Sequence, residues 1–312
     1  MSDLIFCINA VLPIFLVVFF GYFLGRRGLL DPVTAGKMNT LCFKWALPVL
    51  LFCDLVDADF GSFADPKLLI FVAVSVCVTF ALVWAISALF IRDRKKLGSF
   101  AQVGYRSNYV ILGITLISNV YGDSEAVAVA SVVTAVAVPM FNMFAVILLS
   151  FCGGTGKRGF LSTVAGVAKN PLIIGAVLGL IVSALPFEIP VALRKGLDYI
   201  GGMASPIAFL VIGARIELRG IFSKLSLWVA AVRLVIVPLV GISVAVALGF
   251  RDAELMSLMV MFAAPAAVSS YAMATNMGCD EKLAADGVFV TTLFSVVTIT
   301  MWLFVLRSLS LI

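Results

Sequence analysis

Residues 98–119 read GSFAQVGYRSNYVILGITLISN, and this stretch decides the fold class. It is long enough to cross a bilayer, because a membrane-spanning helix needs about 20 residues. It nevertheless contains Gln102, Arg106, Ser107 and Asn108. Polar groups inside a membrane are costly, and they usually face the interior of a helix bundle or a water-filled cavity. The stretch therefore predicts an interior helix of an integral membrane protein.

The composition of the whole chain agrees with this prediction. Of its 312 residues, 62% are hydrophobic and 12% are charged, whereas a soluble domain has about 25% charged residues. This balance excludes a soluble enzyme and a disordered tail. The chain has no His, its six Cys form no CxxC motif, and it has no phosphate-binding GxxxxGK[ST] loop. We therefore expect no metal site, no cofactor and no enzymatic activity.

The apolar runs predict an all-α protein with ten membrane-spanning helices. If the N-terminus lies outside, the inner loops hold 13 Lys and Arg residues and the outer loops with the C-terminus hold 5. This distribution follows the positive-inside rule and explains the net charge of +5 without a nucleic-acid partner. We expect a multi-pass protein of the cytoplasmic (inner) membrane with both termini outside. The spans lie near residues 4–25, 35–56, 67–91, 98–119, 124–151, 163–186, 192–216, 223–249, 253–277 and 282–307.

The spacing of prolines indicates an internal repeat. Pro171 stands 158 residues after Pro13, and Pro206 stands 158 residues after Pro48. Since each repeat would hold five helices, an odd number, the second must cross the membrane in the opposite direction, as in many secondary transporters. The alternative is that membrane helices simply tolerate proline. We predict repeat 1 in residues 1–152, a cytoplasmic linker in 153–160 and repeat 2 in 161–312.

A second interrupted helix occupies the equivalent place in repeat 2. Residues 263–276 read AAPAAVSSYAMATN, and Pro265 removes a backbone donor and frees the carbonyl four residues before it. Two broken helices that cross in mid-membrane would present backbone N–H groups to an anion. Asn108 could add a donor and Arg106 a positive charge. Alternatively, the polar groups only hold helices together and Arg106 extends to the membrane interface.

Several stretches of the chain carry a family resemblance. Tyr105-Arg106-Ser107-Asn108, followed by Leu-Gly-Ile-Thr-Leu at 112–116, resembles the fourth-helix motif of the auxin efflux carrier family. This family includes bacterial malate and malonate permeases and plant PIN carriers, and it is related to the bile acid/sodium symporters. The resemblance covers essentially the whole chain. Further similar stretches lie at 46–52, 169–171, 206–214 and 264–271.

This resemblance implies a sodium/proton antiporter-like fold with two inverted repeats, in which broken helices 4 and 9 cross where the substrate carboxylate binds. It implies a scaffold domain at about 4–56 and 163–216, a transport domain at about 67–151 and 223–307, and a homodimer formed through the scaffold. Where the family has Gly-x-Pro, this chain has Gly113-Ile114-Thr115, so the break of helix 4 would rest on Gly113 and Thr115. The candidate substrate-binding residues are Arg106, Ser107, Asn108, Gly113, Thr115, Pro265, Ala266, Ser269, Ser270 and Tyr271.

Several other ionisable residues fall inside predicted spans, namely Lys44, Asp54, Asp198, Arg233 and Asp286. Arg233 lies deep in the eighth span and Asp286 about one turn into the tenth. We expect them to form an internal ion pair, which would either be structural or carry a coupled proton. Asp54 stands near the end of the second span, where a carboxylate is expected at the membrane interface.

Together these features favour a secondary transporter that moves a small organic anion by elevator-like alternating access. The alternatives are a monovalent cation/proton antiporter, a bile acid-like sodium symporter and, less favoured, a channel or membrane receptor. An antiporter needs carboxylates at the crossing, but neither 98–119 nor 263–276 contains Asp or Glu. Coupling to protons or sodium, the direction of transport and the identity of the anion stay open.

Overall fold

The computed structural model describes residues 2–56, 65–109, 116–117, 120–121, 124–153, 166–185, 189–217 and 220–312. The described part of the chain is helical and has no named strand. Six of its helices are long and apolar enough to cross a membrane, and two shorter helices are also apolar. The protein is therefore an all-α protein of the integral membrane class.

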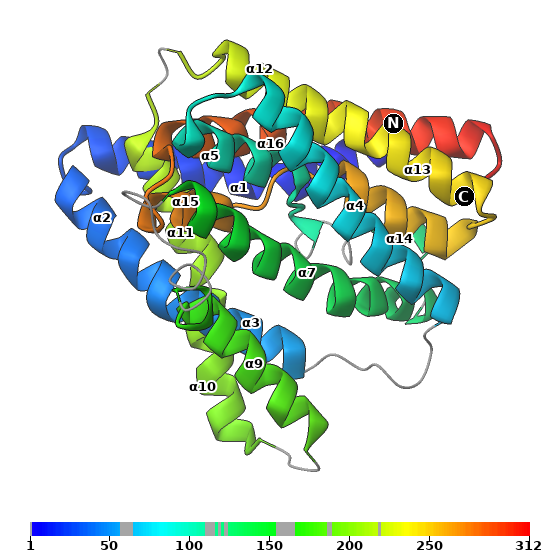
Figure 1. The fold of residues 1–312 in the computed structure, drawn as a ribbon, viewed down its shortest axis with the longest axis horizontal. Coiled ribbons are helices and arrows are strands. Elements are labelled where there is room, and N and C mark those ends of the chain that lie inside the picture. The colour runs from blue at the N-terminus through cyan, green and yellow to red at the C-terminus, as the bar shows by residue number, and fades with distance from the viewer. Residues whose placement is uncertain are drawn as a thin grey trace.

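The helices follow one another along the chain with two π-helical turns, η1 and η2, among them (Figure 1). The elements are α1 (Ser2–Arg26), α2 (Pro32–Leu41), η1 (Cys42–Ala46), α3 (Leu47–Val56), α4 (Pro66–Phe90), α5 (Arg94–Tyr105), α7 (Ser124–Cys152), α9 (Pro171–Ala184), α10 (Val191–Gly202), α11 (Ala204–Arg215), α12 (Lys224–Ala231), η2 (Val232–Ile236), α13 (Val237–Ala247), α14 (Asp252–Ala263), α15 (Ser269–Asn276) and α16 (Glu281–Ser308).

An Asp or Asn followed by Pro begins three of these helices. The side chain accepts a hydrogen bond from a backbone N–H of the first turn, and proline at the first helical position has no N–H that needs a partner. These local signals explain why the helices begin where they do. The caps are Asp31 at α2, Asp65 at α4 and Asn170 at α9, which accept from the N–H groups of Thr34, Lys67 and Leu172.

Two helices are interrupted in the interior, and their interruptions meet. α5 ends at Tyr105, and the break between α14 and α15 spans residues 264–268. Ser107 and Ala266 form an antiparallel β-bridge. The N–H of Asn108 donates to Pro265 O over 2.8 Å, and the N–H of Ala267 donates to Arg106 O over 3.3 Å. The structure thus brings the two breaks together, as the sequence predicts, because each unwound segment supplies backbone partners that the other lacks.

Two helix pairs pack with their backbones unusually close. α1 packs along α11, and α3 packs along α9. A Cβ atom added at Gly21 of α1 would meet the backbone of Leu210, and one added at Gly179 of α9 would lie 2.8 Å from Phe52 O. Small residues at such contacts permit van der Waals packing between membrane helices. In Figure 1, α3, α9 and α10 gather at one end of the molecule, away from α4, α13 and α14.

Candidate functional site

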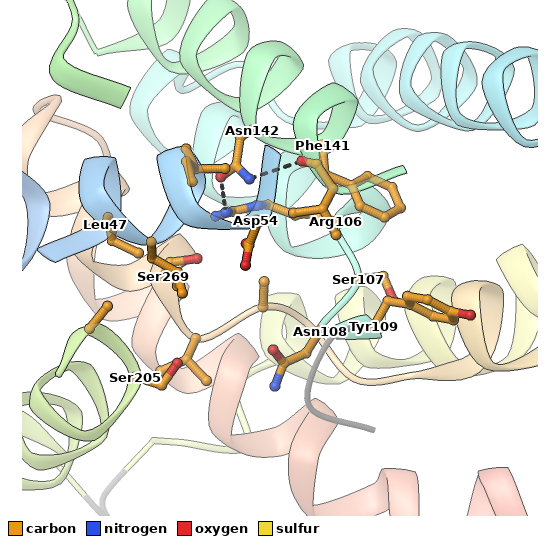
Figure 2. Close-up of a pocket in the computed structure, with 16 residues that line it drawn as sticks. Leu47, Asp54, Arg106, Ser107, Asn108, Tyr109, Phe141, Asn142, Ser205 and Ser269 are labelled. Atoms are coloured by element: carbon orange, nitrogen blue, oxygen red, sulfur yellow. Dashed lines mark hydrogen bonds between the residues drawn. The ribbon is translucent and has the colours of Figure 1, made fainter. Parts of the chain in front are cut away.

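A cavity of about 150 Å³ lies beside the crossing of the two interrupted helices. One side is formed by α3 and the start of α11, and the other by the unwound segments, α7 and the start of α15. Figure 2 shows the polar side chains that line it. The lining residues are Leu47, Leu50, Leu51, Asp54, Arg106, Ser107, Asn108, Tyr109, Val138, Phe141, Asn142, Ala204, Ser205, Ala267, Val268 and Ser269.

Arg106 brings a buried positive charge to this cavity. Its side chain is 4% exposed, so it does not extend to the membrane interface. One Nη atom donates to Asn142 Oδ1 (Figure 2). The other Nη atom lies 3.0 Å from Met273 Sδ. Among the described residues, no carboxylate lies within ion-pair distance of Arg106. Because a guanidinium has five N–H donors, Arg106 keeps donors for an anion in the cavity.

Ser107 and Asn108 follow Arg106 in the unwound segment and also line the cavity. The backbone of Asn108 is held by Pro265 O, which positions its side chain at the crossing. The Ser107 hydroxyl is buried and has no hydrogen-bond partner among the described residues. An unpartnered buried hydroxyl is costly, so a ligand that accepts or donates a hydrogen bond here would be stabilised.

The N-terminus of α15 adds a further favourable feature for an anion. Ala267, Val268 and Ser269 line the cavity, and α15 begins at Ser269. The first N–H groups of a helix carry a partial positive charge. Arg106 and this helix end both favour a carboxylate in the cavity, whereas Asp54, which also belongs to the lining, opposes it.

The predicted site residues divide into three groups. Arg106, Ser107, Asn108 and Ser269 line the cavity, whereas Gly113 and Thr115 lie outside the described residues. The other predicted residues are buried or form the crossing without lining the cavity. Successive helix residues point about 100° apart, which explains why Ser269 faces the cavity and the next two residues do not. This last group contains Pro265, Ala266, Ser270 and Tyr271.

The predicted ion pair between Arg233 and Asp286 is wrong. Arg233 donates to the backbone carbonyls of Tyr105, Met261 and Ala264, while Asp286 Oδ2 lies 3.5 Å from the Nζ of Lys282 in the same helix. The freed carbonyls of the broken helices are nearer to Arg233 than any carboxylate of the described residues. A proton-carrying role for Asp286 stays a prediction.

Sequence reasoning missed several polar residues of the cavity, among them Asn142 and Asp54. Asn142 accepts from Arg106 and donates to Val138 O, and its position in the middle of the apolar helix α7 was the signal that could have identified it. Asp54 lines the cavity from α3, although its place near the end of a span suggested the membrane interface. Both residues reach the site only because α3 and α7 pack against the crossing.

Comparisons with known proteins show that the chain is similar to membrane transporters. The chain is 27% identical to an uncharacterized transporter, YfdV, of Escherichia coli (strain K12), over 98% of this chain and 100% of the relative. It is 25% identical to an uncharacterized transporter of Methanothermobacter thermautotrophicus, over 96% and 98%. It is also 25% identical to a "putative malonate transporter" of Rhizobium meliloti, over 96% and 95%.

A family model described as "Membrane transport protein" matches residues 6–155 and 161–303. The two matched segments are separated by residues 156–160, which fall within the predicted linker between the repeats. The match covers nearly the whole chain and agrees with the resemblance to auxin efflux carriers found in the sequence. The buried arginine at a crossing of interrupted helices and these matches lead to one conclusion: the chain belongs to the Mem_trans family of membrane transport proteins, the auxin efflux carrier-like permeases.

Proposed function

We propose that this protein is a secondary transporter that moves a small organic anion, a carboxylate, across the cytoplasmic membrane. The observation that carries the proposal is Arg106, a buried cation that faces a cavity and pairs with no described carboxylate. A carboxylate in the cavity would receive charge-assisted hydrogen bonds from Arg106. The relative with malonate in its name supports this substrate class.

We further propose that the chain crosses the membrane ten times in two inverted five-helix repeats. The close helix contacts support this proposal. Gly179 stands 158 residues after Gly21, and Leu210 stands 158 residues after Phe52. Gly21 packs against the backbone of Leu210, and Gly179 packs against the backbone of Phe52. A twofold relation between the repeats would produce such a reciprocal pair of contacts, and its offset equals the proline spacing.

Elevator-like alternating access would move one group of helices past the other. The cavity lies at the boundary that this motion requires, since α3 and α11 belong to the proposed scaffold and α5, α7 and α15 to the proposed transport domain. Two ion pairs cross the same boundary. Lys282 Nζ lies 3.4 Å from Glu217 Oε2, and Arg215 Nη1 lies 4.0 Å from Glu281 Oε1. Both would have to open when the transport domain moves.

Uptake in proteoliposomes tests the proposed function. A panel of labelled monocarboxylates and dicarboxylates, malonate included, is offered under imposed pH or sodium gradients. We expect saturable uptake of at least one acid. In Asn108→Ala, we expect the half-saturating concentration to rise by about tenfold or more, because a hydrogen bond to a charged group contributes about 1.5–3 kcal/mol.

The matched control for Asn108→Ala is Asn276→Ala. Asn276 lies at the end of α15, away from the cavity lining, and its side chain donates to Ala272 O over 2.8 Å and to Asn39 O of α2 over 3.4 Å. Uptake by Asn276→Ala is expected to stay close to wild type. Normal uptake by Asn108→Ala would show that the substrate site is elsewhere. Single-channel currents in a planar bilayer would show that the protein is a channel and not a carrier.

A cross-link between the two proposed domains tests the elevator motion. Glu217→Cys and Lys282→Cys are introduced together and joined with a short bismaleimide. We expect uptake to fall to background after cross-linking, since the segment that directly follows α11 could no longer separate from α16. Each single variant treated with the same reagent is the control for labelling alone. Unchanged uptake in the fully cross-linked protein would exclude a relative motion of these helices.

Two further expectations complete the proposal. The N-terminus and C-terminus lie outside, which labelling of Cys introduced at either end in intact cells would test. The protein forms a homodimer through the scaffold, as the family resemblance implies. Large apolar residues such as Leu178, Ile181 and Leu193 are exposed on α9 and α10 and would face lipid or a second copy.

A further inference from the structure

Arg233 is a second buried arginine near the crossing, and it is held entirely by backbone oxygens. It lies in the π-helical turn η2 and is 1% exposed. Its Nε donates to Ala264 O over 2.8 Å, and its two Nη atoms donate to Tyr105 O and Met261 O over 2.9 Å each. Among the described residues, no carboxylate pairs with it. The structure therefore buries a full positive charge among neutral carbonyls.

These three carbonyls belong to the C-terminal ends of the two half-helices. Tyr105 is the last residue of α5, and Met261 and Ala264 lie at the end of α14. Pro265 has no N–H, so Met261 O cannot make its usual helical hydrogen bond. The last carbonyls of any helix carry a partial negative charge. Two such ends converge here and make a site for a cation.

The local fold holds Arg233 at this position. The turn η2 widens the helix between α12 and α13, and such turns often occur at functional sites. Trp302 of α16 donates from its indole Nε1 to Leu234 O over 3.1 Å. Arg233 also belongs to the same proposed transport domain as both half-helices, so the guanidinium would travel with the crossing.

In carriers built on interrupted helices, unwound backbone carbonyls and half-helix C-termini commonly coordinate a sodium ion. In this protein a guanidinium occupies the point toward which three such carbonyls converge. From this geometry we infer that Arg233 takes the place of a coupling cation at the crossing. The wild-type protein then binds no sodium or potassium among these carbonyls, and removal of the guanidinium creates a site for a small cation there.

Only the effect on transport rests on the proposed carrier function. Binding of the cation can be tested without any substrate. The full-length protein is purified in detergent, and its Tm is followed by tryptophan fluorescence in choline, sodium, potassium or sub-denaturing guanidinium chloride at equal ionic strength. The wild-type Tm is expected to be the same in choline, sodium and potassium, and slightly lower in guanidinium, which destabilises folded proteins in general. The Tm of Arg233→Ala is expected to fall in choline and to recover most of the loss in sodium or guanidinium.

Arg251→Ala is the matched control. Arg251 also donates to backbone carbonyls, those of Val246 and Phe250, but near the exposed end of α13. Any loss of Tm in Arg251→Ala is expected to be the same in all four salts. If the Tm of Arg233→Ala shows no more dependence on the cation than that of Arg251→Ala, the inference is overturned.

Two further variants keep the test decisive if Arg233→Ala does not fold. Arg233→Lys retains a cation, whereas Arg233→Met has similar length without charge. We expect Arg233→Lys to be monodisperse with a Tm independent of the cation, and Arg233→Met to be aggregated in choline. Equal behaviour of the two variants would show that the charge at this position is not what the carbonyls require.

Transport distinguishes failure of this inference from failure of the carrier function. Wild-type uptake is expected at the same rate in sodium, potassium and choline at constant pH. If a sodium gradient drives wild-type uptake and sodium also raises the wild-type Tm, the inference is overturned and the carrier function stands. If no acid is taken up but cations still restore the Tm of Arg233→Ala, the cation site stands and the carrier function does not.

Discussion

Arg106→Gln is expected to abolish uptake of the organic anion at substrate concentrations that saturate the wild type. Glutamine carries no charge but is still a hydrogen-bond donor. The variant therefore removes the cation from the cavity and leaves a polar side chain beside Asn142, the partner of Arg106. Loss of one charged partner from a buried pair costs about 2–5 kcal/mol. A cost of about 2.8 kcal/mol corresponds to about 100-fold weaker binding.

The measurement is the concentration dependence of uptake in proteoliposomes, with reconstitution checked by the amount and monodispersity of protein. Arg106→Lys is expected to be intermediate, because lysine keeps the charge but not the planar fork that matches a carboxylate. Arg251→Gln, near the exposed end of α13, is the control and is expected to transport like wild type. If Arg106→Gln keeps wild-type saturation, the charge at the crossing does not bind the substrate.

Gly21→Leu and Gly179→Leu are both expected to prevent stable folding. A Cβ at either position meets backbone atoms of the partner helix, namely Leu210 for Gly21 and Phe52 for Gly179. Backbone cannot move aside as the end of a side chain can, so the helices must separate. Overpacking usually costs about 1–3 kcal/mol, and four added carbons at a backbone contact belong at the upper end of this range or above it. The measurements are Tm and the elution profile of the purified protein.

Gly196→Leu is the matched control for both variants, because a Cβ at Gly196 of α10 has open space around it. We expect its Tm to stay near that of the wild type. If the two repeats are related by inversion, Gly21→Leu and Gly179→Leu have similar effects. A Tm for Gly21→Leu as high as that of Gly196→Leu would mean that α1 and α11 do not approach as closely as the structure has them.

The sequence predicted the interrupted helices because each interruption has a local cause. Pro265 cannot donate to the carbonyl of Met261. The break of the other helix was expected at Gly113 and Thr115, which lie outside the described residues. The structure breaks the second helix at Pro265, ends α5 already at Tyr105, and pairs Ser107 with Ala266 between the two interruptions. Site residues such as Asn108 could be predicted from the sequence because a polar side chain inside an apolar span is itself a local signal.

The partners of the buried arginines could not be predicted in this way. The expectation for Arg233 followed a sound rule, that a buried charge seeks an opposite charge. It failed because the broken helices offered three carbonyls without helical partners. Asn142 was missed as the partner of Arg106 because the two residues are 36 positions apart and meet only through the packing of α5 on α7.

The sequence by itself determined the membrane class, the helix caps and the helix break at Pro265, because these depend on composition and on residues within about one turn of each other. The tertiary structure alone decided which side of each break faces a cavity and which faces Arg233. The reason is physical: each helix break frees polar groups at both of its ends, and only the packing of distant helices decides whether a cavity or a guanidinium meets each of them.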